Sequence, residues 1–599
     1  MARRFASKVL DRGFRSVQDP SSQDPSFGRL NDTPEDSGAG LGYAALFAIA
    51  AVTGGVSATA AIGKEPVLNG TLTAVATVAA SGLSVLSQPP ASFGDLDGVN
   101  GFTIGNDSGN YSSIGYAVSG LGDVNGDGLD DVIVGVSTFE GAGESYVVFG
   151  RAAGGPASLK LSELDGSNGF RIDGAFDGDD VGRAVGGAGD VNGDGFDDII
   201  VGGVNDGPYG FTGPGQAYVV FGSDQGFPAS LALATLDGTD GFRIEGEELG
   251  DYAGRSVSGA GDINGDGFDD LVVGAPFAGP RSDPSYPGAA PGRGYVVFGK
   301  AAGFAASLDL ASLDGSNGFR LDGEALGDQA GWSVSGAGDI NGDGFDDVLV
   351  SDLSGAAGPY GGAYYGNGRA YVVFGRAAGF TAALDLQSLD GSDGFSVVGA
   401  DPAARLGFSV SDAGDVNGDG LADFVLGAPG NDGFGGPASA GDAYVVFGTG
   451  GPQPASLDLS TLDGSNGFRI AGVDIGDRTG WSVGGGDVNG DGLGDLILGA
   501  RSAGATAGPS GKGEAVVVFG SDQGFAPIFY LTSIDGISGF RILGSAASDR
   551  AGSSVSAAGD LDGDGFGDFL VGASGVGAGA GEVYVVFGGA FGLGTLAYR

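Results

Sequence analysis

A nine-residue string rich in aspartate recurs seven times along this chain of 599 residues, and it limits the possible folds more than any other feature. The fourth copy reads DINGDGFDD, and the others differ from it at only a few positions. The copies begin at Asp123, Asp190, Asp262, Asp339, Asp415, Asp487 and Asp560, at intervals of 67 to 77 residues. A regular spacing of this kind indicates a repeat architecture in which each repeat is one supersecondary unit.

Two further strings stay in register with the aspartate string. A YVVFG-like string begins at Tyr146, Tyr218, Tyr295, Tyr371, Tyr444, Val516 and Tyr584. A GFRI-like string begins at Gly101, Gly169, Gly241, Gly318, Gly394, Gly467 and Gly539. Because three strings keep the same order in every unit, the units are expected to share one fold.

Each unit contains four short apolar runs that are rich in β-branched and aromatic residues, which is typical of strands. In the fourth unit the runs are Trp332–Ala337, Val348–Val350, Ala370–Phe374 and Gly394–Val398. No helical periodicity extends over ten residues within the repeats. The sequence therefore predicts an all-β fold, a seven-bladed β-propeller of four-stranded blades over residues 99–588. A solenoid is the alternative, but solenoids need atypical capping repeats and none is visible.

The order of the strings also predicts how the ring closes. The first GFRI-like string, Gly101–Ile104, precedes the first aspartate string, whereas no such string follows the last YVVFG at Tyr584–Gly588. We expect the N-terminal strand Gly101–Ile104 to pair beside Tyr584–Phe587 and complete the last blade. This closure would remove two exposed sheet edges, which otherwise promote aggregation.

The aspartate strings have the chemistry of a cation site. Counted from the first aspartate of the fourth copy, Asp339, Asn341, Asp343 and Asp347 occupy positions 1, 3, 5 and 9, and Phe345 offers its carbonyl at position 7. Hard oxygen ligands at alternate positions of a tight turn suit Ca²⁺, whereas most transition metals prefer nitrogen or sulfur. Position 12 is apolar and a strand follows, so the loop is not an EF-hand.

Asn-Gly and Asp-Gly are also ordinary hairpin turn formers, which is the alternative interpretation. A turn needs no third carboxylate, however, and all seven copies keep aspartate at positions 1, 5 and 9. The sequence thus predicts up to seven Ca²⁺ ions. The candidate ligands are Asp123, Asn125, Asp127, Leu129, Asp131, Asp190, Asn192, Asp194, Phe196, Asp198, Asp262, Asn264, Asp266, Phe268, Asp270, Asp339, Asn341, Asp343, Phe345, Asp347, Asp415, Asn417, Asp419, Leu421, Asp423, Asp487, Asn489, Asp491, Leu493, Asp495, Asp560, Asp562, Asp564, Phe566 and Asp568.

These motifs resemble the FG-GAP repeats of the N-terminal β-propeller of integrin α subunits. The resemblance rests on Gly-aromatic-Ser-Val strings such as Gly331–Val334, on the DxNGDGxxD loops, and on Gly-Ala-Pro at Gly274–Pro276. It implies calcium in the hairpin between the first and second strands of each blade, and ligand binding on the opposite face. The fourth unit departs from the family pattern, because Ser351–Ser354 replaces Gly-Ala-Pro.

Composition excludes several other functions. The chain has no Cys and no His, which rules out disulfides, zinc fingers and imidazole-based catalysis. The GxSxG string Gly480–Gly484 therefore cannot act as the nucleophile elbow of a histidine-dependent hydrolase. The net charge of −48 argues against nucleic-acid binding. We expect no enzymatic activity, with a hydrolase or lyase that uses acidic residues as the alternative.

Connections between the second and third strands vary most between units, and by propeller topology they share the face opposite the aspartate loops. Several contain tyrosine, phenylalanine or arginine on glycine-rich backbone, which suits contacts with protein or glycan. Plain solvated connections are the alternative. The ligand-face candidates are Tyr209, Phe211, Arg281, Tyr286, Tyr360, Tyr364 and Tyr365.

The first 98 residues have a different composition. Residues 1–36 contain six basic residues among many polar ones, and we expect them to be disordered. Residues 37–63 form an Ala-rich apolar segment without charge, which suits an export signal, a membrane anchor or a packing helix. Residues 64–98 have the composition of a linker, and residues 589–599 form a C-terminal tail.

The sequence as a whole predicts a secreted or cell-surface calcium-binding propeller that acts as an adhesion or binding module for protein or glycan. One alternative is a self-assembling surface protein whose N-terminal segment makes the polymer contacts or binds a membrane. Another is a carbohydrate-binding lectin on the same scaffold. The sequence leaves the ligand and the assembly state open.

Overall fold

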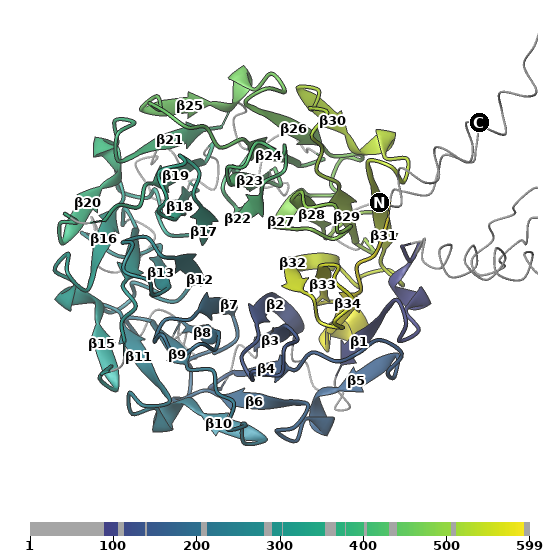
Figure 1. Cartoon of the computed structure of the whole chain (residues 1–599), viewed down its shortest axis with the longest axis horizontal. Coiled ribbons are helices and arrows are strands. Elements are labelled where there is room, and N and C mark those ends of the chain that lie inside the picture. The colour runs from purple at the N-terminus through teal and green to yellow at the C-terminus, as the bar shows by residue number, and fades with distance from the viewer. Residues whose placement is uncertain are drawn as a thin grey trace, which may run out of the picture. The chain divides into compact units, whose positions relative to one another are not determined.

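The computed structural model describes residues 89–105, 113–137, 141–204, 213–280, 290–301, 303–353, 367–377, 379–399, 404–430, 440–504 and 511–591. These residues form seven β-sheets arranged in a ring around a central axis (Figure 1). The predicted all-β, seven-bladed propeller is therefore confirmed. The apolar segment at 37–63 and residues 1–36 before it lie outside the described residues. Among the described residues, no helix has the length and hydrophobicity needed to cross a membrane.

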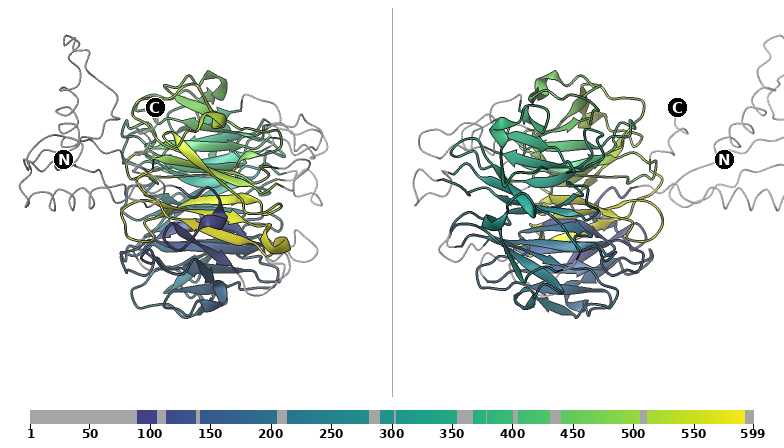
Figure 2. Two further views of the ribbon diagram at one scale, coloured as in Figure 1. Left: turned by 90° about the vertical axis from the view of Figure 1, so that its right-hand side faces the viewer. Right: turned by 60° about the vertical axis from the view of Figure 1, so that its left-hand side comes forward.

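Each blade is an antiparallel sheet whose first strand lies nearest the axis and whose fourth lies toward the rim (Figure 1). The first strands are β2 (Ser113–Gly122), β7 (Ala184–Gly189), β12 (Ser256–Gly261), β17 (Val334–Gly338), β22 (Ser409–Gly414), β27 (Thr479–Gly486) and β32 (Ala551–Gly559). The second strands are β3 (Asp131–Ser137), β8 (Asp198–Gly203), β13 (Asp270–Ala275), β18 (Asp347–Asp352), β23 (Asp423–Ala428), β28 (Asp495–Ala500) and β33 (Asp568–Ala573). Figure 2 shows from the side that the strands run between the two faces of the ring.

The outer strands complete the blades. The third strands are β4 (Glu144–Val148), β9 (Gln216–Val220), β14 (Arg293–Val297), β19 (Arg369–Val373), β24 (Asp442–Val446), β29 (Glu514–Val518) and β34 (Glu582–Val586). The fourth strands are β6 (Gly169–Asp173), β11 (Gly241–Glu245), β16 (Gly318–Asp322), β21 (Gly394–Val398), β26 (Gly467–Ala471), β31 (Gly539–Leu543) and, in the seventh blade, β1 (Gly101–Gly105).

A short fifth strand, which the sequence did not predict, joins six of the seven sheets. It comes from the connection between the third and fourth strands of the next blade, and it pairs in parallel with the fourth strand of the preceding one. These strands are β5 (Ser158–Lys160), β10 (Ser230–Ala232), β15 (Ser307–Asp309), β20 (Ala383–Asp385), β25 (Ser456–Asp458) and β30 (Ile528–Tyr530). Each such pairing ties neighbouring blades together through backbone hydrogen bonds.

Other short elements are single turns. The described residues include the 3₁₀ turns η1 (Phe93–Asp95), η2 (Leu161–Glu163), η3 (Leu233–Thr235), η5 (Leu310–Ser312), η6 (Leu386–Ser388), η7 (Leu459–Thr461) and η8 (Leu531–Ser533). An α-helical turn, α3 (Val576–Gly579), precedes β34. Each of η2, η3 and η5 to η8 directly follows a fifth strand, and each buries its first leucine.

The ring closes as predicted, because β1 pairs antiparallel with β34 and Phe102 lies opposite Val585. The N-terminal residues make a second closure as well. The Leu543 amide at the end of β31 donates to the Ala91 carbonyl at 3.3 Å, so residues before β1 take the place of a fifth strand on the sixth blade. Phe93 in η1 then stacks on Tyr584 with a ring separation of 4.3 Å.

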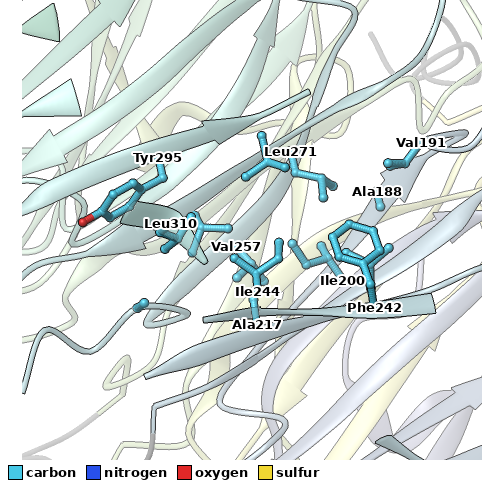
Figure 3. Close-up of a cluster of buried hydrophobic side chains, with 14 of the residues drawn as sticks. Ala188, Val191, Ile200, Ala217, Phe242, Ile244, Val257, Leu271, Tyr295 and Leu310 are labelled. Carbon is cyan, nitrogen blue, oxygen red and sulfur yellow. The ribbon is translucent and has the colours of Figure 1, made fainter. Parts of the chain in front are cut away.

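The hydrophobic core consists of layers between neighbouring blades (Figure 3). In one layer Phe242 and Ile244 of the second blade pack together with Val257 and Leu271 of the third. Every residue of the seven second strands is buried, because each of these strands has a strand on either side and a blade on either face. Continuous apolar runs such as LVVGA, which follows Asp270 in β13, are the sequence signature of this position.

Candidate metal centre

The aspartate strings form the hairpin loops between the first and second strands of the blades. In the fourth blade β17 ends at Gly338, the loop begins at Asp339, and Asp347 at loop position 9 is the first residue of β18. Loop positions are numbered from the first aspartate of each copy. Because every blade repeats this arrangement, the seven loops lie at the same face of the ring.

The aspartate at position 1 holds the turn in shape. Asp339 Oδ1 accepts the N–H groups of Gly342 at 2.7 Å and Asp343 at 3.0 Å, and its Oδ2 accepts that of Gly344 at 2.8 Å. The bonds from the amides of positions 5 and 6 to this side chain occur in all seven loops. The carboxylates at positions 1 and 5 are thereby fixed on one short turn.

The aspartate at position 9 is buried and joins two of the repeated strings. Asp347 Oδ2 accepts the Ile340 N–H at 3.0 Å, and its Oδ1 accepts the N–H of Gly375, the glycine of YVVFG, at 2.9 Å. Both bonds recur in all seven blades. Sequence reasoning treated position 9 only as a metal ligand and missed this structural role, although the fixed order of the two strings was a signal for it.

Burial has a strong electrostatic effect on these carboxyl groups. Removal from water raises the pKa of Asp131, Asp198, Asp270, Asp347, Asp495 and Asp568 to about 8, and that of Asp423 to about 7. The charges of the aspartates at positions 1 and 5 raise the pKa further, whereas the two backbone N–H groups lower it. A cation bound at the loop would relieve this repulsion.

Neighbouring loops are joined to one another around the ring. At position 8, Asp346 Oδ2 accepts the Asp262 N–H of the preceding blade at 2.9 Å. The same bond is made by Asp130, Asp197 and Asp269, whereas Ala422, Gly494 and Gly567 occupy this position in the last three blades. Neighbouring loops also pack closely at position 4. A Cβ on Gly265 would lie 2.3 Å from the ring of Phe345 in the next loop, so this position requires glycine.

The seventh loop brings three carboxylates together. Oxygen atoms of Asp560, Asp562 and Asp564 lie within 4.8 Å of one another, a spacing that suits a shared cation. Burial and the neighbouring Asp564 charge raise the pKa of Asp562 to about 6. Asp568 is not part of this trio, and its oxygens accept the Leu561 and Gly588 N–H groups. The donor set therefore fits a hard divalent ion, and the individual ligand assignments stay predictions.

The residues of the predicted ligand face fall outside the part of the chain that the structure describes. They are Tyr209, Phe211, Arg281, Tyr286, Tyr360, Tyr364 and Tyr365. The GxSxG string, by contrast, is part of β27, where Ser482 Oγ donates to the Gly552 carbonyl at 3.3 Å. That serine therefore helps to join the sixth blade to the seventh.

Comparison with known proteins agrees with this geometry. Segments 114–148, 253–297, 408–446, 479–519 and 551–586 match the FG-GAP repeat model. The molecule is thus a β-propeller in which five segments are similar to FG-GAP repeats, and it resembles the propeller of integrin α chains.

Three relatives illustrate the range of the similarity. The chain is 30% identical to integrin alpha-5 of Xenopus laevis over 252 residues, which cover 42% of this chain and 20% of that protein. It is 27% identical to integrin alpha-PS2 of Drosophila melanogaster over 290 residues, which cover 47% of this chain and 18% of that protein. It is also 34% identical to a phosphatidylinositol-glycan-specific phospholipase D of Bos taurus over 176 residues, which cover 28% of this chain and 19% of that protein. The match thus spans about a fifth of the length of each relative.

Proposed function

We propose that this propeller is a calcium-stabilised module for adhesion or binding, exposed at the cell surface or secreted. The observation that supports it best is the sevenfold repetition of one loop geometry, in which fixed carboxylates at positions 1 and 5 adjoin a buried aspartate at position 9. The resemblance to integrin α chains supports the adhesive role. We further propose that the module has no catalytic activity of its own.

Calcium would act mainly on stability. Three carboxylates that share a loop within a few ångströms repel one another by about 1 kcal/mol or more per pair at surface dielectric. A divalent ion replaces this repulsion with attraction and adds oxygen coordination. Because the backbone N–H of position 8 donates to the position-1 carbonyl of the preceding loop at all seven junctions, stabilising each loop stabilises the contacts between blades.

Metal content and thermal stability test the calcium proposal together. Native mass spectrometry of the full chain should show up to seven bound Ca²⁺ ions, and a chelator such as EGTA should lower the melting temperature by several degrees. Asp339→Asn keeps an acceptor oxygen for the loop amides and removes one charge, so it should lower the metal count by one. Asp385→Asn at the exposed end of β20 is the matched control and should leave the count unchanged. A melting temperature that is the same in calcium and in EGTA would contradict the proposal.

The proposed ligand face is the one opposite the aspartate loops. It carries the connections between second and third strands, and it is free of the hydrogen-bonded loop ring that occupies the other face. The binding role is tested by display of the calcium-loaded protein to arrays of extracellular-matrix proteins and of glycans. Saturable binding that survives substitution of a single aspartate loop is expected, and no binding to either array would count against an adhesive role.

A further inference from the structure

A cavity of about 290 Å³ lies at the axis of the ring, within the first strands of the blades. Its lining comes from all seven first strands or the residues just before them, together with Arg501 after β28 and Ser574 after β33. These two residues follow second strands, so the cavity opens on the face opposite the aspartate loops. We call it the axial mouth. Its size is near the lower end of the range for small-ligand sites.

One residue per blade forms a ring around the axial mouth, and each directly follows a glycine with positive φ. Gly331, for example, has φ of 83°, and a Cβ there would lie 2.1 Å from the Arg293 carbonyl oxygen. The tight backbone crossing fixes the position of the next side chain. The ring residues are Tyr116, Arg183, Arg255, Trp332, Phe408, Trp481 and Ser553, all of them half-buried. Trp332, Phe408 and Trp481 are consecutive around this ring, and so are Arg183 and Arg255.

The charge of the lining is opposite to that of the protein. The chain has 75 acidic and 27 basic residues, yet the residues that line the mouth include Arg183, Arg255 and Arg501 and neither Asp nor Glu. Arg183 lies 3.6 Å from Asp180, which is buried beside the ring. A local positive field on a strongly acidic molecule attracts anions and disfavours cations.

The arginines are held against aromatic rings. The Arg255 guanidinium lies 4.5 Å from the centre of the Trp332 ring, and that of Arg501 lies 3.8 Å from Trp481. Phe408 packs between the two tryptophans, with its ring centre 4.4 Å from that of Trp481. A guanidinium that stacks through its face directs its N–H groups sideways, which is the geometry for paired hydrogen bonds to a carboxylate or sulfate.

Serine hydroxyls supply a second kind of polar group. The Oγ atoms of Ser256, Ser333 and Ser409 accept N–H groups from the first strand of the next blade, at 3.0 to 3.2 Å. These bonds fix the spacing between blades at the mouth. A hydroxyl that accepts one hydrogen bond can still donate its own proton, so the mouth combines rigid hydroxyls with arginines and aromatic rings.

We propose that the axial mouth binds an acidic saccharide, through one or two sugar rings that bear a carboxylate or sulfate group. The arginines would bind the anionic group, the serines would hydrogen-bond ring hydroxyls, and the aromatic side chains would contact the C–H groups of the sugar. An acidic peptide would also attract the arginines but would not use the serine hydroxyls and the aromatic side chains of the mouth as a sugar would. This inference rests on the proposed binding function and names its ligand class.

The chain provides its own probe for this site, because Trp332 and Trp481 are its only two tryptophans and both line the mouth. Calcium-loaded, desalted protein would be titrated with trigalacturonate, a hyaluronan tetrasaccharide and a chondroitin sulfate tetrasaccharide, which separate carboxylate from sulfate recognition. Maltotriose is the neutral control of similar size. We expect a saturable change in tryptophan fluorescence with at least one acidic sugar, at least tenfold weaker with maltotriose and weaker at higher salt.

Variants separate the mouth from the rest of the molecule. Arg255→Gln and Phe408→Ala should each weaken binding by at least tenfold. Arg376→Gln is the matched control, since Arg376 also stacks on a ring, that of Phe380, but does not line the mouth. Fluorescence that is insensitive to all three acidic sugars, or equally sensitive to maltotriose, would overturn the proposal. Hexaglutamate is titrated in parallel as the peptide control, and a response to it alone would also overturn the proposal, in favour of a peptide ligand. The calcium count and melting temperature are read separately, so failure here leaves the calcium proposal standing.

Discussion

The aspartate at position 9 shows how one residue can serve two chemical purposes. Its side chain is buried where the loop meets the second strand, and both oxygens accept backbone N–H groups from different strings of the repeat. Burial of a carboxylate is costly, and these hydrogen bonds offset part of that cost. The remaining repulsion from positions 1 and 5 is what a bound cation would neutralise. We therefore expect this residue to matter even in the absence of metal.

Substitution of Asp347 tests the structural part of this role. Asp347→Ala leaves the N–H groups of Ile340 and Gly375 without an acceptor in a buried site, at about 1–3 kcal/mol for each group. We expect the free energy of unfolding to fall by roughly 2–5 kcal/mol in denaturant titrations carried out in EGTA, where no metal contributes. Asp347→Asn retains one acceptor, so its stability should lie between those of Asp347→Ala and the unmodified protein. A free energy of unfolding for Asp347→Ala within about 0.5 kcal/mol of that of the unmodified protein would contradict this structural role.

At the scale of elements, the blades are held together by pieces that cross from one to the next. The short fifth strands, the position-8 aspartates and the residues before β1 all join a blade to its neighbour. Aromatic pairs strengthen these joints, as where Phe319 stacks on Phe380 at 4.6 Å. The N-terminal joint closes the ring with residues that are distant in sequence from those they contact.

Phe93 is the residue through which we would test that closure. Its ring is 1% exposed and stacks on Tyr584, so Phe93→Ala should cost about 3–5 kcal/mol and lower the melting temperature. Val99→Ala lies on the same segment at 66% exposure and should change stability by less than about 0.5 kcal/mol. Differential scanning calorimetry of both variants in calcium measures the difference between their melting temperatures. Equal melting temperatures for the two variants would show that this joint does not hold the ring closed.

At the scale of the whole molecule, the net charge of −48 works against compactness, and seven calcium ions would offset +14 of it. The acidic loops are concentrated at one face of the ring, whereas the axial mouth opposite them is lined by arginines. The propeller thereby separates a candidate metal face from a candidate ligand face. The two faces are not in direct contact, so the residues of each face can be mutated separately.

The pH dependence of stability follows from the raised pKa values of the position-9 aspartates. In the metal-free protein six of these groups have a pKa of about 8, so the folded state binds more protons than the unfolded state, in which the pKa is near 3.8. Their contribution to stability is therefore present at low pH and is lost as the pH rises through about 8. We expect EGTA-treated protein to become less stable from pH 5 to pH 8.

Calcium should reverse this trend, because it competes with protons for the same carboxylates. The increase in melting temperature on adding calcium should be small at pH 5 and several degrees larger at pH 8. Thermal scans at the two pH values, each with calcium and with EGTA, measure the difference. An increase of the same size at both values would show that these carboxyl groups are not linked to metal binding.

Much of the fold could be predicted from the repeats alone. Seven copies in register fixed the number of blades, the four main strands of each, and the pairing of Gly101–Ile104 with the last blade. The fifth strands escaped prediction because a three-residue run such as Ser307–Asp309 is too short to show alternation and pairs only with a neighbouring blade. The role of Phe93 also escaped prediction, because its partner Tyr584 is nearly the whole propeller away in sequence.

The sequence by itself determined what is local and repeated: the aspartate loops, the strand order and the excess of acidic charge. Tight turns and strand alternation depend on neighbouring residues, so they can be read along the chain. Only the tertiary structure decided which residues distant along the chain meet: the aspartate at position 9 with two backbone N–H groups of its own repeat, and the arginines and tryptophans of the axial mouth from different blades. The ring residues of the axial mouth come one from each repeat, and only the arrangement of the blades around one axis brings them together.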